Sequence, residues 1–330
     1  MKKAEKKTSR RPAGKPAART ARKAAPKRDF LDLTDLSRAE LLELLAHAGR
    51  LKAQRAAGKE KPLLGGKTLA MIFEKPSTRT RVSFELAAVE QGGRAIFLSP
   101  GDIQLGRGES IRDTAQVLSR YCHAIVLRTF GHQRLVELAR CASVPVINGL
   151  SDLNHPCQIL ADLLTVKEIF GRVENLSVAY VGDGNNVAHS WVTATALLGL
   201  DLRIASPAGY EPPETVLREV ARRRGPGSVQ VLQDPKEAAR GAHVLYTDVW
   251  TSMGQEEEAV RRRKAFAGYA ITRALLDVAD PKARVLHCLP AHWGEEIEAE
   301  LEGDPRLAIF DEAENRLHAQ KALLIKLLGA

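Results

Sequence analysis

The sequence predicts an α/β protein with two doubly wound parallel-sheet domains and an active site in the cleft between them. Three observations support this fold class. The chain has 330 residues, which fits two domains of ordinary size. Short apolar segments alternate with longer helical ones, as in parallel sheets covered by helices. Polar clusters directly follow several of the apolar segments, and open parallel sheets bind ligands beyond the carboxyl ends of their strands.

The first unit begins with leucines at helical spacing over Leu36–Leu51, where Ser37 can act as the N-cap. An apolar strand over Thr68–Phe73 leads into a polar segment at Ser77–Arg81, and then into a helix that stops at Gly92-Gly93. Further short strands are expected at Ala95–Leu98, Ala124–Leu127 and Val144–Ile147. This alternation predicts the first parallel sheet.

A helix over about Cys157–Phe170 separates this unit from a second one of the same kind. There, a strand is expected at Ser177–Val181, a turn at 182–186 and a helix at Val187–Leu198. Later strands are expected at Leu202–Ala205, Val229–Leu232, His243–Thr247 and Val285–Cys288. These segments predict the second parallel sheet.

The basic character of the chain is confined to its first 28 residues. The formal net charge is +9, but residues 1–28 hold twelve Lys or Arg and one acid, which leaves −2 on the rest. This segment lacks Leu, Ile, Val, Phe, Trp and Tyr, so a disordered tail is predicted for residues 1–28. A targeting address or a nucleic-acid-binding arm is the alternative. The near-neutral remainder argues against nucleic acid as a partner.

Composition also excludes other classes of protein. No unbroken apolar run approaches the roughly 18 residues of a membrane-spanning helix, so no membrane partner is expected. The cysteines have irregular spacing and form no C-x-x-C pair, which excludes a disulfide framework and a cysteine-rich zinc module. This usage fits a reducing compartment, and we expect a cytoplasmic protein.

Ser77-Thr78-Arg79-Thr80-Arg81 is the most informative segment. Hydroxyls and guanidiniums meet where a helix begins, and a helix N-terminus offers free N–H groups and the positive end of its dipole. Arginine adds planar, bidentate donors that suit phosphate oxygens. An N-capping hydroxyl followed by solvated arginines is the alternative, and the pattern favours phosphate binding.

Further polar residues lie at the expected domain junction and at strand ends. His155 and Gln158 open a helix and lie one turn apart, so both can reach one carbonyl and amide group. Cysteine is usually a small buried hydrophobe, but Cys288 ends an expected strand, which favours a place in the site. Asp248, followed by Ser252-Met253-Gly254, offers a carboxylate for a ligand ammonium.

Gly182-Asp183-Gly184-Asn185-Asn186-Val187 partly matches a dinucleotide fingerprint. The third glycine is replaced by Val187, and the next expected strand is followed by Ser206 instead of an acid. A nicotinamide cofactor is therefore not expected.

Together these segments resemble the aspartate/ornithine carbamoyltransferase family, most closely its ornithine-specific members. The resemblance runs from about Asp29 to Ala330 and leaves the tail outside. The matching motifs, in order, are Phe73-Glu74-Lys75-Pro76-Ser77-Thr78-Arg79-Thr80-Arg81, Gln104-Leu105-Gly106, Arg128-Thr129, His155-Pro156-Cys157-Gln158, Gly182-Asp183-Gly184-Asn185-Asn186, Asp248 with Ser252-Met253-Gly254, His287-Cys288-Leu289-Pro290, and Glu314-Asn315-Arg316. Trp293 is a departure, because family members often have Arg after Ala-His.

The resemblance implies a carbamoyl-phosphate-binding domain over residues 29–152 and an ornithine-binding domain over 153–311. A C-terminal helix over 312–330 is expected to pack back on the first domain. The resemblance also implies a homotrimer with active sites near subunit contacts. The implied reaction transfers the carbamoyl group of carbamoyl phosphate to the side-chain amine of L-ornithine, giving L-citrulline and phosphate. It would serve arginine biosynthesis or, in reverse, arginine catabolism.

The same resemblance implies a role for each site residue. Phosphate would be held by Ser77, Thr78, Arg79 and Thr80, with Gln104 reaching in from a neighbouring subunit. The carbamoyl-phosphate pocket would further include Arg128, His155, Pro156, Cys157, Gln158, Cys288, the Leu289 backbone and Arg316. Arg128, His155, Gln158, Cys288 and Arg316 would be catalytic. Ornithine would be bound by Asn186, Asp248, Ser252 and Met253.

The implied chemistry is a direct transfer. The neutral amine attacks the carbamoyl carbon, a tetrahedral intermediate forms and phosphate leaves, so preorganised donors are the appropriate catalysts. Neither a metal, another cofactor nor a covalent nucleophile is expected, and Cys288 would position the amine. Two alternatives remain: a transferase acting on putrescine, acetylornithine or aspartate, and a non-catalytic carbamoyl-phosphate-binding regulatory protein. Asp248 with the Ser-Met-Gly loop favours ornithine, and the combination of phosphate, carbamoyl and amino-acid motifs favours an enzyme.

Overall fold

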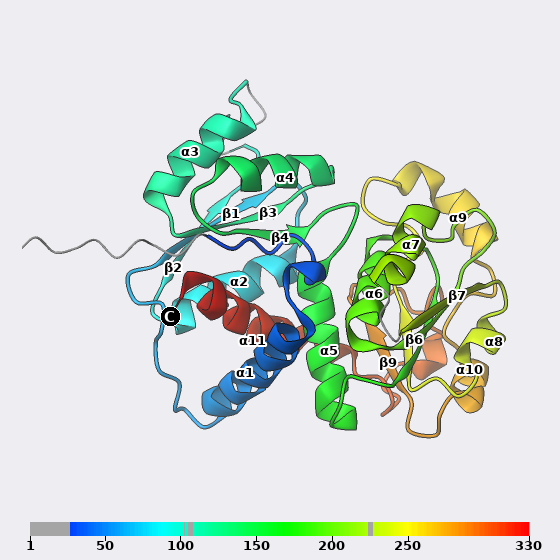
Figure 1. Cartoon of the computed structure of the whole chain (residues 1–330). Helices are drawn as coiled ribbons and strands as arrows, with labels where there is room; N and C mark the ends of the chain where they lie inside the picture. Colours follow the sequence, from blue (N-terminus) through cyan, green and yellow to red (C-terminus); the bar gives the residue numbers. More distant parts are fainter. Residues whose placement is uncertain (1–26, 102, 105–107, 224–226, 330) are drawn as a thin grey trace, which may run out of the picture.

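The computed structural model describes residues 27–101, 103–104, 108–223 and 227–329 (Figure 1). These residues form two α/β units, each built on a sheet in which every neighbouring pair of strands is parallel. The predicted fold class is thereby confirmed. No helix within these ranges is long and apolar enough to cross a membrane.

The first sheet has the strand order β2-β1-β3-β4. Its strands are β1 (Thr68–Phe73), β2 (Arg94–Leu98), β3 (Ala124–Arg128) and β4 (Val146–Leu150). The helices α1 (Arg38–Ala56), α2 (Thr78–Glu90), α5 (Pro156–Phe170) and α11 (Ile309–Leu328) gather on one side, and α3 (Ile111–Tyr121) and α4 (His132–Cys141) cover the other (Figure 1). Neighbouring side chains of β1 point to opposite faces of the sheet. Met71 lies in the hydrophobic core on the side of α1, α2, α5 and α11, and Ile72 lies in the core on the side of α3 and α4.

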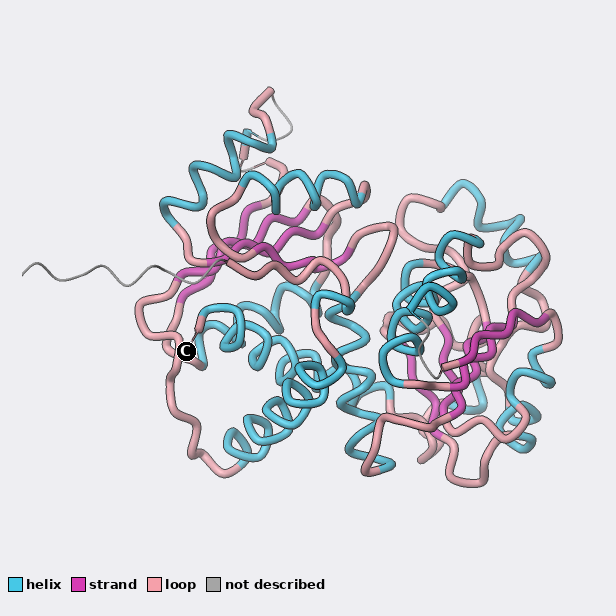
Figure 2. The backbone as a smooth tube through the Cα atoms, in the orientation of Figure 1, coloured by secondary structure: helices cyan, strands magenta, loops and turns pink. Residues whose placement is uncertain are grey.

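The second sheet has the strand order β7-β6-β5-β8-β9. Figure 2 shows the strands of the two sheets in magenta, with the helices around them in cyan. Its strands are β5 (Ser177–Val181), β6 (Asp201–Ala205), β7 (Ser228–Leu232), β8 (Val244–Thr247) and β9 (Arg284–His287). Its helices are α6 (Asn186–Leu198), α7 (Glu214–Arg223), α8 (Pro235–Ala239), α9 (Ala259–Ala265) and α10 (Arg273–Val278). Short 3₁₀ helices occur at Leu33–Asp35, Glu256–Glu258 and Ala299–Leu301.

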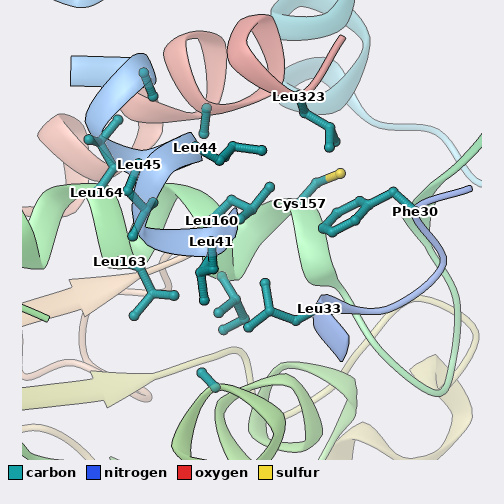
Figure 3. Close-up of a cluster of buried hydrophobic side chains, with 14 of the residues drawn as sticks. Phe30, Leu33, Leu41, Leu44, Leu45, Cys157, Leu160, Leu163, Leu164 and Leu323 are labelled. Carbon is teal, nitrogen blue, oxygen red and sulfur yellow. The ribbon is translucent and has the colours of Figure 1, made fainter. Parts of the chain in front are cut away.

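One hydrophobic core runs from the first unit into the second. Helix α5 lies between them, and its leucines pack against Leu41 and Leu45 of α1 and Leu323 of α11 (Figure 3). The same cluster continues through Trp191 of α6 to Tyr246 of β8. This shared core fixes how the carboxyl ends of the two sheets face each other.

Most predicted strands are found within one or two residues of the observed ones. Thr68–Phe73 and Ser177–Val181 match at every residue. The strand expected at Val144–Ile147 starts instead at Val146, after Pro145, which has no N–H for a ladder bond. The strand expected to end at Cys288 ends one residue earlier, at His287.

The end of the predicted tail contacts the folded chain. Arg28 forms an ion pair with Glu40 and also donates to the Asp35 carbonyl, and Lys27 pairs with Asp29 at 2.9 Å. Residues 1–26 of the tail lie outside the described residues. The C-terminal helix begins at Ile309, three residues before its expected start, and packs against α1, α2 and α5.

Candidate active site

A cavity of about 950 Å³ opens at the carboxyl ends of the central strands of both sheets. Its walls come from the segments that follow β1, β3, β4, β5, β8 and β9, with Arg316 of α11 added from behind. All the predicted site residues except Gln104, Pro156 and Cys157 line this cavity. The position matches the general rule for ligand sites in open parallel sheets.

The first wall is the N-terminus of α2. Ser77 is the N-cap, and its hydroxyl accepts the Thr80 N–H at 3.2 Å. The side chain of Arg79 projects from the first turn and donates to the Leu289 carbonyl on the opposite side of the cavity. Exposed helix N–H groups and one guanidinium thus face the same space.

Three guanidiniums converge on this wall. Burial, together with the positive charges of Arg316 and Arg79, lowers the pKa of Arg128 to about 10. Burial also lowers the pKa of Arg316, and the charge of Arg79 acts in the same direction. The Nε atoms of Arg128 and Arg316 are buried without a hydrogen-bond partner among the described residues. Such mutual repulsion and unpaired donors are relieved by a bound anion.

His155 is neutral in this environment. Its burial lowers its pKa well below the usual value, and the positive charges of Arg316, Arg128 and Arg79 add to the effect. Its Nδ1 is buried and has no partner in the described part of the chain, while its backbone N–H donates to Ser190 at 2.8 Å. The imidazole can therefore serve as a hydrogen-bonding group for a ligand without carrying charge.

Gln158 and Thr80 hold Arg316 in place. One nitrogen of the Arg316 guanidinium donates to Oε1 of Gln158, and the other donates to Oγ1 of Thr80 at 3.1 Å. Gln158 lies in the first turn of α5 and Thr80 lies in the first turn of α2. The Arg316 guanidinium, which projects from α11, is therefore fixed between the N-termini of α5 and α2.

The opposite wall carries Asp248, the carboxylate that the sequence predicts for a ligand ammonium. Its carboxylate is buried and accepts from Nδ2 of Asn185 at 2.7 Å and from Sγ of Cys288 at 3.0 Å. Burial raises the pKa of Cys288 well above the usual value, and the Asp248 charge raises it further. Cys288 is therefore a thiol at neutral pH, which argues against a nucleophilic role.

The other predicted amino-acid-binding residues line the same cavity as Asp248. Asn186 opens α6 and donates from Nδ2 to the Ser151 carbonyl at 2.7 Å, so its Oδ1 is directed elsewhere. Ser252 and Met253 lie in the loop after β8, where the Ser252 N–H donates to Oε1 of Gln255 at 3.1 Å. Met253 is exposed. These groups supply an amide oxygen, a hydroxyl and an apolar side chain.

Leu289 joins the two walls through its backbone. It has a left-handed conformation with φ 60° and precedes a cis peptide bond to Pro290. Its carbonyl accepts from Arg79, and its N–H donates to Nδ1 of His287 at 2.8 Å. The Leu289 backbone therefore contacts the Arg79 guanidinium across the cavity.

Three predicted residues do not line the cavity. Cys157 is fully buried in the core between α1, α5 and α11 (Figure 3), and its thiol donates to the Asn148 carbonyl. Burial raises its pKa to about 12. Pro156 is the first residue of α5 and is buried. Gln104 is exposed on the segment that follows β2, and its motif partners Leu105 and Gly106 lie outside the described residues.

The structure adds cavity residues that sequence reasoning missed. Asn185 is the N-cap of α6 and orients the Asp248 carboxylate. Lys75 pairs with Asp152 at 2.6 Å, shortly before the N-terminus of α2. Asp183 also lines the cavity, and burial raises its pKa to about 7, although it pairs with Arg262. The N-cap position of Asn185 was the one signal available in the sequence.

Gly184 and Trp293 now have structural explanations. A Cβ on Gly184 would lie 2.3 Å from the Pro212 nitrogen, so this glycine is required by close packing. Trp293 packs against the apolar cluster on the outer face of the second sheet. The glycine of the partial dinucleotide fingerprint is therefore explained by packing, without a dinucleotide ligand.

One group of side chains in the described residues could approach a metal ion. The ligating atoms of His292, Glu295 and Glu296 lie within 4.8 Å of one another. Oε1 of Glu296 already accepts from His292 N–H at 2.6 Å, and Glu295 pairs with Arg263 at 3.0 Å. These contacts within the protein account for the closeness of His292, Glu295 and Glu296 without a metal ion.

Comparison with known proteins gives a consistent result over nearly the whole folded chain. A family model described as the carbamoyl-P binding domain of aspartate/ornithine carbamoyltransferase matches residues 28–168, and the Asp/Orn binding domain model matches 174–327. The ornithine carbamoyltransferase of Acidothermus cellulolyticus is 57% identical over 306 residues, covering 92% of this chain and 97% of that protein. That of Methanoculleus marisnigri is 53% identical, with 92% and 97% covered. The solved structure of ornithine carbamoyltransferase from Pyrococcus furiosus has a TM-score of 0.88 and 50% identity, covering 92% of this chain and 98% of that one.

Proposed function

The chain belongs to the aspartate/ornithine carbamoyltransferase family, and we propose that it transfers the carbamoyl group of carbamoyl phosphate to the side-chain amine of L-ornithine, giving L-citrulline and phosphate. One observation carries this proposal. A wall of three guanidiniums at a helix N-terminus faces a buried carboxylate, Asp248, across one cavity. Such a site can hold an anion and an ammonium group at the same time.

Carbamoyl phosphate would bind at the first wall. Its phosphate would take the N–H groups of α2, the hydroxyls of Ser77, Thr78 and Thr80, and the Arg79 guanidinium. Its carbonyl oxygen would accept from Arg128 and from neutral His155, and its amide would donate to Oε1 of Gln158. The first domain, residues 29–152 with the C-terminal helix, would thus hold the phosphate, and His155 and Gln158 at the start of α5 would contact the carbamoyl group.

Ornithine would bind at the second wall, formed within residues 153–311. Its α-ammonium would pair with Asp248, and Asn186 and Ser252 would contact its amino-acid end, with Met253 covering the aliphatic chain. The side-chain amine would then point past the Cys288 thiol toward the carbamoyl carbon. Cys288 would position the amine as a neutral hydrogen-bonding group.

The chemical step needs only the two substrates and these side chains. The neutral amine donates its lone pair to the carbamoyl carbon, and negative charge develops on the carbonyl oxygen, facing Arg128 and His155. The C–O bond to phosphate then breaks, the electron pair leaves with the phosphate, and the nitrogen loses one proton, which the departing phosphate accepts. Arg79 stabilises the charge on the departing phosphate, and Arg316, held by Gln158, completes the carbamoyl pocket.

Substrate choice is tested with a panel of amines. We expect citrulline formation from ornithine, with putrescine and N-acetylornithine slower by as much as about 10⁴-fold, because each leaves polar groups of the second wall unpaired. Aspartate lacks the side-chain amine and should not react. Comparable rates with putrescine and ornithine would overturn the assignment of ornithine but leave carbamoyl transfer intact. Binding of carbamoyl phosphate with no product from any amine would favour the regulatory alternative.

The pH dependence of the reaction should follow the substrate. The ornithine side-chain amine resembles that of lysine, with a pKa of about 10, so its reactive neutral fraction grows tenfold per pH unit below that value. His155 stays neutral in this range because burial depresses its pKa. We expect kcat/KM for ornithine to rise with a slope of about one from pH 6.5 to 8.5, in the wild type and in His155→Asn alike. A bend in the wild-type plot of kcat/KM against pH that is absent from the plot for His155→Asn would contradict a neutral His155.

We also propose that the protein is a homotrimer. Val82, Leu86 and Val89 form an exposed apolar stripe on α2, and Ile96 is exposed on the edge strand β2. Gln104 follows the same edge, which is consistent with reaching a neighbouring site. Light scattering should give three times the 36.1 kDa chain mass, and Val89→Glu should reduce it. A fully active monomer would contradict this arrangement.

The free thiols Cys122, Cys141, Cys157 and Cys288 are consistent with a reducing, cytoplasmic location, which we adopt as part of the proposal. There the reaction would serve arginine biosynthesis, or arginine catabolism when it runs in reverse.

A further inference from the structure

Two buried carboxyl groups lie behind Gln158, outside the cavity lining. Nε2 of Gln158 donates to Oδ1 of Asp162 at 2.8 Å and to Oε1 of Glu312 at 2.7 Å. Asp162 lies one turn along α5, and Glu312 lies in the first turn of α11. Both acids are fully buried. The mechanism described above does not use either of them.

These acids determine which way the Gln158 amide points. Carboxylate oxygens accept hydrogen bonds, so the NH₂ group must face Asp162 and Glu312, and Oε1 must face Arg316. Burial raises the pKa of both acids, and the Asp162 charge raises that of Glu312 further.

Glu312 also reaches the second sheet. Its Oε2 accepts the backbone N–H of His287 at 2.8 Å, and its Oε1 accepts the Tyr246 hydroxyl at 3.2 Å. His287 is the last residue of β9 and directly precedes Cys288. One carboxyl group thus connects the amide on the carbamoyl-phosphate side with the strand end on the ornithine side.

We infer that Glu312 is a positioning residue, which holds the Gln158 amide and the Cys288 strand end in the relative placement required for carbamoyl transfer. This inference rests on the proposed function. Through Gln158, Glu312 also fixes Arg316, because Oε1 of Gln158 accepts from that guanidinium. A displacement of about 1 Å between reacting groups can lower the rate roughly 100-fold.

Glu312→Gln is the informative variant because it preserves size but removes one acceptor. Glu312 accepts on both oxygens, from Gln158 and Tyr246 on one and from the His287 N–H on the other. A glutamine must present its NH₂ group to one of these donors, so one contact is lost. We expect kcat to fall about 100-fold. Because the α2 phosphate wall is unchanged, the inhibition constant of inorganic phosphate should change less than about threefold.

Lys321→Met is the matched control for damage to α11. Lys321 is also fully buried on this helix, and it pairs with Glu60 at 2.5 Å and Glu90 at 2.6 Å, away from the cavity. We expect this variant to lose thermal stability at least as much as Glu312→Gln does, while it keeps kcat within about threefold of the wild type. Equal losses of activity in both variants would show that Glu312 acts only through the stability of the helix, and would overturn the inference.

Glu312→Asp covers the case in which the glutamine variant does not fold. Aspartate keeps both acceptors but is one methylene shorter, so it cannot reach Gln158 and His287 together. We expect kcat to fall at least tenfold, again with unchanged phosphate inhibition, and a kcat within threefold of the wild type would overturn the inference. Wild-type protein is assayed in parallel. Its failure to form citrulline would reject the proposed function itself, a result distinct from an active wild type with an equally active variant.

Discussion

Replacing Arg79 with lysine is expected to lower kcat/KM for carbamoyl phosphate roughly 10- to 150-fold in a folded protein. Lysine keeps the charge but loses the planar pair of donors that suits phosphate oxygens. A hydrogen bond to a charged group contributes about 1.5–3 kcal/mol, and each 1.4 kcal/mol corresponds to a factor of ten. Arg79 also donates to the Leu289 carbonyl, so the variant should loosen the contact between the two walls of the cavity.

Arg55→Lys is a suitable control for this substitution. Arg55 makes a bidentate contact with Glu90 on the surface, at 3.1 and 2.9 Å, and does not line the cavity. Its replacement should leave steady-state kinetics within about twofold of the wild type. Wild-type kinetics for Arg79→Lys would reject the assignment of Arg79 to the phosphate.

Asp248→Asn should raise KM for ornithine by roughly 30-fold or more, while KM for carbamoyl phosphate changes less than about threefold. The variant removes the carboxylate that would pair with the α-ammonium, and loss of one partner of a buried charge pair costs about 2–5 kcal/mol. It also places an amide beside Asn185 and Cys288, which both donate to Asp248 in the native protein. The carbamoyl phosphate dependence of the same variant is the internal control. Equal changes in both substrate dependences would instead indicate a general disturbance of the cavity.

The parallel sheets could be predicted because their strands are short, apolar and followed by polar turns. Ser177–Val181 is a clear case, since Gly182 follows it directly and a helix begins at Asn186. Helices such as α3 and α4 were not predicted, because their buried positions are few and mixed with charged residues. Their place on the outer face of the first sheet depends on tertiary packing with side chains such as Ile72 and Ile125.

Much of the candidate site could also be predicted from local sequence, because its residues lie at strand ends and helix starts. Contacts between distant segments could not. Nothing near Glu312 indicates that it meets Gln158 and the end of β9, and nothing near Asp183 indicates its pairing with Arg262. Cys157 shows the opposite limit: it adjoins His155 and Gln158 in sequence, but the helical turn directs it into the core.

Transfer of a labelled carbonyl carbon tests the proposed reaction most directly. Carbamoyl phosphate carrying ¹³C in its carbamoyl group is incubated with the purified protein and ornithine, and the product and phosphate are quantified together. We expect labelled citrulline and phosphate in a one-to-one ratio, formed only when ornithine is present and strongly reduced in Arg79→Lys. Release of phosphate without labelled citrulline, or transfer of the label to the protein itself, would contradict direct carbamoyl transfer to ornithine.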